Sequence, residues 1–226
     1  MTVVLSPSLG GDASMFEPQR NGGLEGHVVE HPGHGGTPVA PLATIRDLSL
    51  SALAGIDAER FAFVGVSLGG AVGMRIALDR PERVDSLALI CTSARFGEPE
   101  AWRERAATVR QHGLEAIVDA VMERWFTPDF ADVRRYREMF LTTDAEGYAR
   151  CCDALASWDV RDEVHAIRAR TLVISGSDDP STPPEHGALL ASLIRDARHV
   201  VIPGARHLAN VDHAEEVNTL LKKHLA

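Results

Sequence analysis

Residues 61–78 predict a strand, a sharp turn and a helix in immediate succession, and this stretch constrains the fold more than any other. The run FAFVGV at 61–66 is apolar and rich in β-branched and aromatic side chains, which is typical of a buried strand. GVSLGG at 65–70 then turns the chain, and helix-forming residues follow to Leu78. A serine at such a turn adopts a strained backbone that only small neighbours permit, so the Ser67 hydroxyl is a candidate nucleophile. Gly-x-Ser-x-Gly also occurs by chance, but the flanking strand and helix favour the functional interpretation.

Two backbone amides near Ser67 are candidates for stabilising an oxyanion. The amide of Leu68 follows the serine at the helix N-terminus, where the helix dipole favours negative charge. A second donor is expected from the loop SPSLGG at 6–11, which follows a short strand at 3–5, so Ser8 or Leu9 is the candidate. Taken alone, this loop is explained equally well as a surface turn.

The rest of the chain alternates strands with helices, which predicts an α/β fold with a mainly parallel sheet. A length of 226 residues suits one domain with a large core. The expected strands lie at 3–5, 27–30, 61–66, 86–91, 171–176 and 198–202, and the expected helices at 44–54, 71–78, 185–194 and 214–225.

From about residue 94 to residue 166 the pattern changes to helices alone. Apolar residues recur there at helical spacing among many arginines and glutamates, from Trp102 to Phe126. We expect such an insertion to cover the carboxyl ends of the strands, where open α/β sheets bind ligands. The predicted domains are therefore an α/β core of residues 1–94 and 166–226 and a helical cap of residues 95–165.

Composition and local spacing argue against several other functions. A net charge of −9 disfavours nonspecific nucleic-acid binding, and no run approaches the ~20 apolar residues of a membrane helix. The first residues lack the basic and apolar segments of a secretory signal, so we expect a cytoplasmic protein. Three cysteines without metal-ligand spacing fit reduced thiols. His31 and His34 lie three apart, but the intervening Pro-Gly and the lack of a third ligand argue against a metal site.

The residue types needed for acyl transfer occur just after three of the expected strands. Ser67 supplies a hydroxyl, His207 a base and Asp179 an acid to orient that base, in the chain order Ser, Asp, His. Because the carboxyl ends of parallel strands lie at one edge of a sheet, we expect these three side chains to meet. Asp178 is the alternative acid, and Asp179 is preferred.

These motifs resemble those of the α/β-hydrolase superfamily and, more narrowly, of the 3-oxoadipate enol-lactonases of bacterial protocatechuate catabolism. The resemblance implies Ser67 as nucleophile, Asp179 as acid and His207 as base, with no metal or organic cofactor. Beyond the turn at 65–70, it rests on PERV at 81–84, TSAR at 92–95, ERWFTP at 123–128, GYARCC at 147–152, DPSTPPEHG at 179–187 and HLANV at 207–211.

The chain departs from this family pattern in two places. Members usually begin with two further strands before the one at 3–5, so we expect six parallel strands without an N-terminal hairpin. A missing hairpin exposes a strand edge, which favours a homo-oligomer or lowers stability. The first loop reads Ser6-Pro7-Ser8 where the superfamily often has His-Gly, which leaves the second oxyanion donor open between Ser8 and Leu9.

The resemblance implies a small-molecule substrate, 3-oxoadipate enol-lactone, that is hydrolysed to 3-oxoadipate through an acyl-enzyme. The free carboxylate of that substrate requires a cation from the cap. Arg124 beside Trp125 is the first candidate and Arg95 the second, although surface salt pairing also explains any single arginine there. The rival interpretations are a carboxylesterase or thioesterase with the same triad, a carbon–carbon bond hydrolase, and a ligand-binding module without catalysis. Such a module is expected to have lost a triad residue, and none is missing here.

Overall fold

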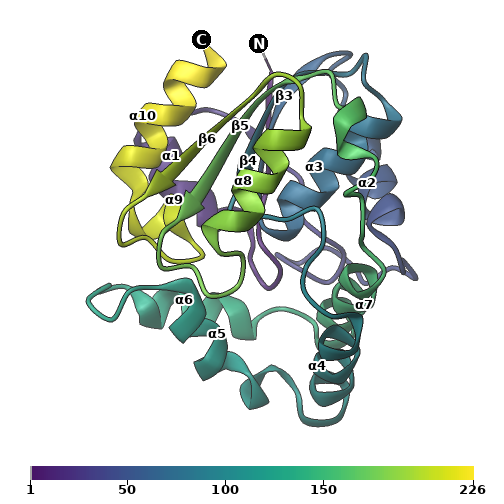
Figure 1. Cartoon of the computed structure of the whole chain (residues 1–226). Helices are drawn as coiled ribbons and strands as arrows, with labels where there is room; N and C mark the ends of the chain where they lie inside the picture. The colour runs from purple at the N-terminus through teal and green to yellow at the C-terminus, as the bar shows by residue number, and fades with distance from the viewer. Residues whose placement is uncertain (1) are drawn as a thin grey trace.

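A computed structural model describes residues 2–226 as a sheet of six parallel strands between layers of helices (Figure 1). The strand order β2-β1-β3-β4-β5-β6 confirms the α/β fold and the six-stranded sheet expected from the sequence. Every residue of β3 is buried, as in a parallel sheet whose two faces are both covered. The strands are β1 (Val3–Ser6), β2 (His27–Val28), β3 (Phe61–Val66), β4 (Val84–Ile90), β5 (Arg170–Gly176) and β6 (Ala197–Ile202).

Helices cover both faces of this sheet (Figure 1). On one face, α3 (Leu68–Asp79) packs on β1, β3 and β4 with α2 (Ile45–Ala54) against it, and α8 (Pro184–Leu193) packs on β5 and β6. On the other face lie α10 (Ala214–Leu225), α1 (Glu17–Asn21) and α9 (Ala209–Asp212). In the described part of the chain, no helix has the length and apolar character needed to cross a membrane.

Four longer helices between β4 and β5 lie beyond the carboxyl ends of the strands, in the lower part of Figure 1. Here α4 (Pro99–His112) packs along α7 (Ala145–Ala156), and α5 (Val118–Trp125) packs against α6 (Val133–Leu141). A short 3-10 turn, η2 (Leu114–Ala116), joins α4 to α5, and another, η3 (Val164–Ala166), precedes β5. We interpret this helical segment as the cap.

Most element boundaries fall within a few residues of the expected ones, and the largest differences lie near the N-terminus. The expected strand at 27–30 is shorter, although the Val29 amide still donates to the Leu5 carbonyl oxygen at 2.9 Å, and the Glu30 carboxylate accepts from the Ala13 amide at 2.9 Å. A 3-10 turn, η1 (Ala13–Phe16), and α1 were not expected from the sequence. Their local signals are an Asp12 carboxylate that caps the Ser14 amide and a proline, Pro18, in the first turn of α1.

Candidate active site

Ser67 stands at the junction of β3 and α3 with a backbone that non-glycine residues rarely adopt. Its φ is 53° and its ψ is −111°. The turn also requires very close backbone approach, since a Cβ at Gly65 would lie 2.3 Å from the carbonyl oxygen of Gly69. A Cβ at Gly69 would lie 2.1 Å from the carbonyl oxygen of Ser6 in the first loop. The small residues of the motif are therefore a steric requirement of the turn.

The structure brings Ser67, His207 and Asp179 together in a chain of hydrogen bonds. His207 Nε2 lies 2.9 Å from Ser67 Oγ, and His207 Nδ1 lies 2.8 Å from Asp179 Oδ2. The ionised Asp179 carboxylate accepts from Nδ1–H, which leaves Nε2 as the acceptor for the Ser67 hydroxyl. The three residues are 7%, 5% and 3% exposed, respectively, so this chain of hydrogen bonds is shielded from bulk water.

Asp179 is held in its ionised form by several donors. Burial alone raises the pKa of this carboxyl, but His207 and hydrogen bonds from Thr182 and Ser181 outweigh burial and lower the pKa to about 2. The Thr182 hydroxyl donates to Oδ2 at 2.7 Å, and the amides of Ser181 and Thr182 donate to Oδ1 at 2.8 and 3.1 Å. Asp178, by contrast, is exposed and accepts from the Ser177 hydroxyl.

The first loop lies against the Ser67 turn and is fixed there through one carbonyl. The Pro7 carbonyl oxygen accepts from the Gly69 amide at 3.1 Å and from His31 Nε2 at 2.9 Å. His31 is fully enclosed, and burial lowers its pKa to about 4, so the ring is neutral near pH 7. Sequence analysis considered His31 only as a metal ligand and missed this contact.

Three buried amides next to Ser67 are available to a ligand. Across residues 2–226, the amides of Leu68, Ser8 and Leu9 have no hydrogen-bond acceptor. The three residues are 0%, 1% and 6% exposed, and buried amides without a partner are rare in proteins. Leu68 is also the first residue of α3, where the helix dipole favours an anion.

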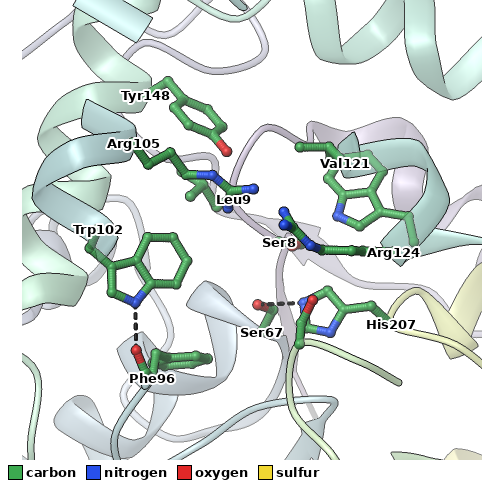
Figure 2. Close-up of a pocket in the computed structure, with 12 residues that line it drawn as sticks. Ser8, Leu9, Ser67, Phe96, Trp102, Arg105, Val121, Arg124, Tyr148 and His207 are labelled. Carbon is green, nitrogen blue, oxygen red and sulfur yellow. Dashed lines mark hydrogen bonds between the residues drawn. The ribbon is translucent and has the colours of Figure 1, made fainter. Parts of the chain in front are cut away.

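Ser67 and His207 open onto a cavity of about 50 Å³ beneath the cap helices (Figure 2). Its walls combine apolar and aromatic side chains with an equal number of serine, arginine and histidine side chains. Arg124 and Trp125, expected from the sequence, line it together with Ser8 and Leu9. The remaining lining residues are Phe96, Trp102, Arg105, Val121, Tyr148 and Ser181.

The structure does not bring Arg95 to this cavity. Arg95 lines a separate cavity with Arg161 and His186, and its guanidinium donates to the Glu98 carboxylate at 2.9 Å. Arg105 does line the active-site cavity and was missed by sequence analysis. The only signal for Arg105 is its spacing of three residues from Trp102 on one helix, which places both side chains on the same face.

The end of α5 is hydrogen-bonded to the loop that carries His207. The His207 amide donates to the carbonyl oxygen of Arg124 at 3.3 Å, and the Leu208 amide donates to that of Trp125 at 3.1 Å. The Arg206 guanidinium donates to the carbonyl oxygens of Glu123 and Phe126. The same short segment therefore lines the cavity with side chains and holds the histidine loop with its backbone.

Residues 2–214 match the sequence profile of a family described as alpha/beta hydrolase fold. Similar proteins include 3-oxoadipate enol-lactonase 2 of Acinetobacter baylyi, which is 34% identical over 96% of this chain and 85% of that protein. A putative carbamate hydrolase, RutD, of Klebsiella pneumoniae is 30% identical over 99% of this chain and 91% of that protein. The crystal structure of the enol-lactonase from Burkholderia xenovorans LB400 superimposes with a TM-score of 0.91 at 36% identity, covering 99% of this chain and 90% of that chain.

Proposed function

This chain belongs to the alpha/beta hydrolase fold family, and from that premise we propose that it hydrolyses 3-oxoadipate enol-lactone to 3-oxoadipate. As a member with enol-lactonase relatives, it is a hydrolase that acts on ester bonds. The observation that carries the substrate proposal is the cavity above Ser67, which combines apolar walls with the free guanidinium of Arg124. Such a cavity suits a small lactone ring that bears a carboxylate.

In the first step, Ser67 attacks the carbonyl carbon of the lactone ring. His207 Nε2 accepts the hydroxyl proton as the new C–O bond forms, and Asp179 stabilises the resulting imidazolium. The negative charge on the former carbonyl oxygen is held by the amide of Leu68 and that of Ser8 or Leu9. Collapse of this intermediate breaks the ring C–O bond and releases the ring oxygen as an enolate, which remains attached through the carbon chain.

In the second step, water completes the reaction. The enolate is a better leaving group than an ordinary alkoxide, and it takes up on carbon the proton that His207 holds, directly or through water, to become a ketone. This transfer leaves His207 neutral. His207 then removes a proton from a water molecule that attacks the Ser67 ester, and the same proton returns to Ser67 as the ester bond breaks. The product is 3-oxoadipate, and Ser67 and His207 return to their starting states.

The cap supplies recognition in this proposal. The Arg124 guanidinium binds the substrate carboxylate, and Trp125 packs against the apolar part of the substrate. We place the reaction in the cytoplasmic breakdown of aromatic acids through protocatechuate and the β-ketoadipate pathway. This placement is supported by the enol-lactonases among the relatives.

A general ester hydrolase is the second candidate. It is favoured by relatives named pimeloyl-[acyl-carrier protein] methyl ester esterase, at 28% and 30% identity. This candidate keeps the same roles for Ser67, His207 and Asp179 and changes only the acyl group. Assays with an aryl ester and with a thioester distinguish this candidate from a thioesterase.

The decisive experiment follows the ultraviolet absorbance of freshly generated enol-lactone with purified enzyme. We expect fast loss of absorbance with the wild type, and a fall of at least about 10³-fold with Ser67→Ala. Spontaneous hydrolysis of the lactone is measured without enzyme and subtracted. An aryl ester and a thioester are assayed alongside.

Three other results would contradict the proposal in different ways. Turnover of the aryl ester or thioester without turnover of the lactone would replace the lactonase assignment by the general ester hydrolase or the thioesterase. Lactone turnover that survives in folded Ser67→Ala would remove Ser67 as nucleophile. Binding of the lactone without any turnover, unchanged in Ser67→Ala, would indicate a ligand-binding module.

A further inference from the structure

Three hydrogen-bond donors from three different cap helices point into the active-site cavity. Arg105 comes from α4, Arg124 from α5 and Tyr148 from α7. Figure 2 shows the two guanidinium groups directed toward each other from opposite sides of the cavity above Ser67, with the Tyr148 hydroxyl turned toward Arg105. Only Arg124 of these three was expected from the sequence.

None of these donors has an acceptor within residues 2–226. Neither guanidinium forms an ion pair or hydrogen bond there, and the Tyr148 hydroxyl also has no partner, although Tyr148 is only 1% exposed. Other arginines of α4 behave differently: Arg103 pairs with Glu100, and Arg110 pairs with Glu146 and Asp153. Tyr148 is buried, whereas Arg105 is partly exposed and Arg124 is exposed, so water reaches the two guanidinium groups in the free protein. The convergence of three donors without a protein acceptor on one cavity indicates a ligand that supplies the acceptors.

The charges of the cluster favour an anion. Partial burial lowers the pKa of Arg124, and the positive charge of Arg105 lowers it further. The Arg105 guanidinium lies over the Trp102 ring, 5.4 Å from the ring centre, and this contact favours its position in the cavity. A carboxylate between the two guanidinium groups would replace repulsion by two attractive contacts.

The cluster also lies on the path to Ser67. A second, more open cavity of about 250 Å³ shares Phe96, Trp102, Arg105, Arg124 and Ser181 with the first. An entering acyl group therefore passes the two arginines before its carbonyl reaches the serine. A neutral acyl group would leave both charges and the Tyr148 hydroxyl without acceptors.

We propose that Arg105 and Tyr148 complete, with Arg124, a three-donor carboxylate site that selects acyl groups ending in a carboxylate. This inference rests on the proposed function, because it names the structural class of substrate that the same site accepts. Arg105 and Tyr148 thereby take part in recognition of the substrate carboxylate. The two arginines make the active site locally cationic in a protein whose net charge is −9.

The test compares two aryl esters that differ in charge and little in shape. The mono-p-nitrophenyl ester of adipic acid carries a terminal carboxylate, and p-nitrophenyl 6-methylheptanoate carries an isopropyl group of similar shape in its place. The ratio of their kcat/KM values, after subtraction of spontaneous hydrolysis, measures charge selectivity. The wild type is expected to favour the adipate ester.

Arg105→Met is the principal variant, because methionine keeps an unbranched stem and removes the charge. We expect the selectivity ratio to fall about 10- to 100-fold, the effect of losing a hydrogen bond to a charged group. Tyr148→Phe keeps the ring and is expected to lower the ratio about 3- to 10-fold. Arg103→Met is the matched control, since it removes the same charge from an exposed position of the same helix and should leave the ratio unchanged.

The outcomes separate this inference from the proposed function. A selectivity ratio that stays at the wild-type value in Arg105→Met, or that falls equally in Arg103→Met, overturns the carboxylate site even if the lactone is hydrolysed. A ratio that falls only in Arg105→Met and Tyr148→Phe supports the site even if the lactone is not a substrate. In that case only the lactonase assignment is lost.

Discussion

Thr182 contributes to the active site without facing the cavity. Its hydroxyl donates to the Asp179 oxygen that also accepts from His207, so it fixes the orientation of the acid. The Thr182 amide donates to the other oxygen of the same carboxylate. A carboxylate held at both oxygens has few alternative positions, which keeps Asp179 in line with the imidazole ring.

Replacing Thr182 by valine should therefore reduce activity without removing any member of the Ser67–His207–Asp179 chain. We expect Thr182→Val to lower kcat about 3- to 10-fold, because one neutral hydrogen bond is lost. Thr182→Ser retains the hydroxyl and should restore most of the rate. Steady-state kinetics on the best substrate provides the measurement, and equal activity in the valine and serine variants would contradict the assigned role.

Gly69 shows how tightly the Ser67 turn is packed. A Cβ at this position would lie 2.1 Å from the carbonyl oxygen of Ser6, and backbone cannot move aside as a side chain can. We expect Gly69→Ala to lower the free energy of unfolding by at least about 2 kcal/mol, measured by urea denaturation. Gly55→Ala is the control, since Gly55 has a φ of −92° and its nearest neighbour would be 3.6 Å away. A loss of stability no larger than that of the control would disprove the steric argument.

The sequence predicted the site residues that follow strands. It missed those whose position in the cavity depends on how a helix is oriented. Ser67, Asp179 and His207 each follow a strand, so a parallel sheet fixes where they meet. In the arginine-rich cap, by contrast, the direction of each side chain depends on how its helix is rotated and packed. Arg95 and Arg105 could not be distinguished on that basis.

At the scale of elements, α5 belongs both to the cap and to the catalytic machinery. Its last turn is held to the histidine loop by backbone bonds and by the guanidinium of Arg206. The Thr127 amide just beyond α5 also donates to the Asp212 carboxylate of α9 at 3.0 Å. These contacts join elements that are about eighty residues apart in the chain, which is why no local sequence pattern predicts them.

Removing the Arg206 side chain should loosen this junction. We expect Arg206→Ala to reduce kcat/KM about tenfold, because the amides of His207 and Leu208 lose the support of a charged donor beside them. Amide hydrogen exchange in residues 118–126 should become faster. Arg198→Ala is the matched control, since Arg198 is exposed on β6 and has no partner among residues 2–226. Similar exchange rates in both variants would refute the coupling.

At the scale of the whole molecule, two enclosed histidines link stability to pH. Burial lowers the pKa of His31 to about 4, and burial together with the charge of His31 lowers the pKa of His34 to about 3, from an ordinary value of 6.5. Between pH 6.5 and each lowered pKa, the histidine binds a proton in the unfolded chain and not in the folded chain. Stability is therefore full above pH 6.5 and falls as the pH drops toward about 4.

Urea denaturation at a series of pH values should reveal this effect. Each histidine contributes a slope of up to roughly 1.4 kcal/mol per pH unit below its unfolded pKa. Asp179 acts at lower pH. Its pKa is lowered from 3.8 to about 2, so the stability that its ionised carboxylate contributes is lost only between these two pH values. His31→Gln should reduce the slope of unfolding free energy against pH by up to roughly 1.4 kcal/mol per pH unit, the contribution of one proton. An unchanged slope would show that His31 is not responsible.

The α/β architecture was readable from the sequence because short apolar runs alternate with helical patterns on both sides of the long helical segment. The additional η1 was not, because its first amide, that of Ala13, is held by the Glu30 carboxylate, which lies 17 residues away in the chain. The pattern of apolar residues determines layers and order, whereas individual polar contacts between distant segments determine where the smaller elements begin and end.

The contacts between α5 and the histidine loop have an implication for how this enzyme could change over evolutionary time. Residues 123–126 hold that loop through their carbonyl oxygens, which every amino acid possesses. The side chains of Glu123 and Arg124 are also exposed, whereas Trp125 and Phe126 are packed among other aromatic rings. New substrates can be acquired by substitution at Arg124 while His207 stays in register with Ser67, so diversification of specificity need not pass through inactive intermediates.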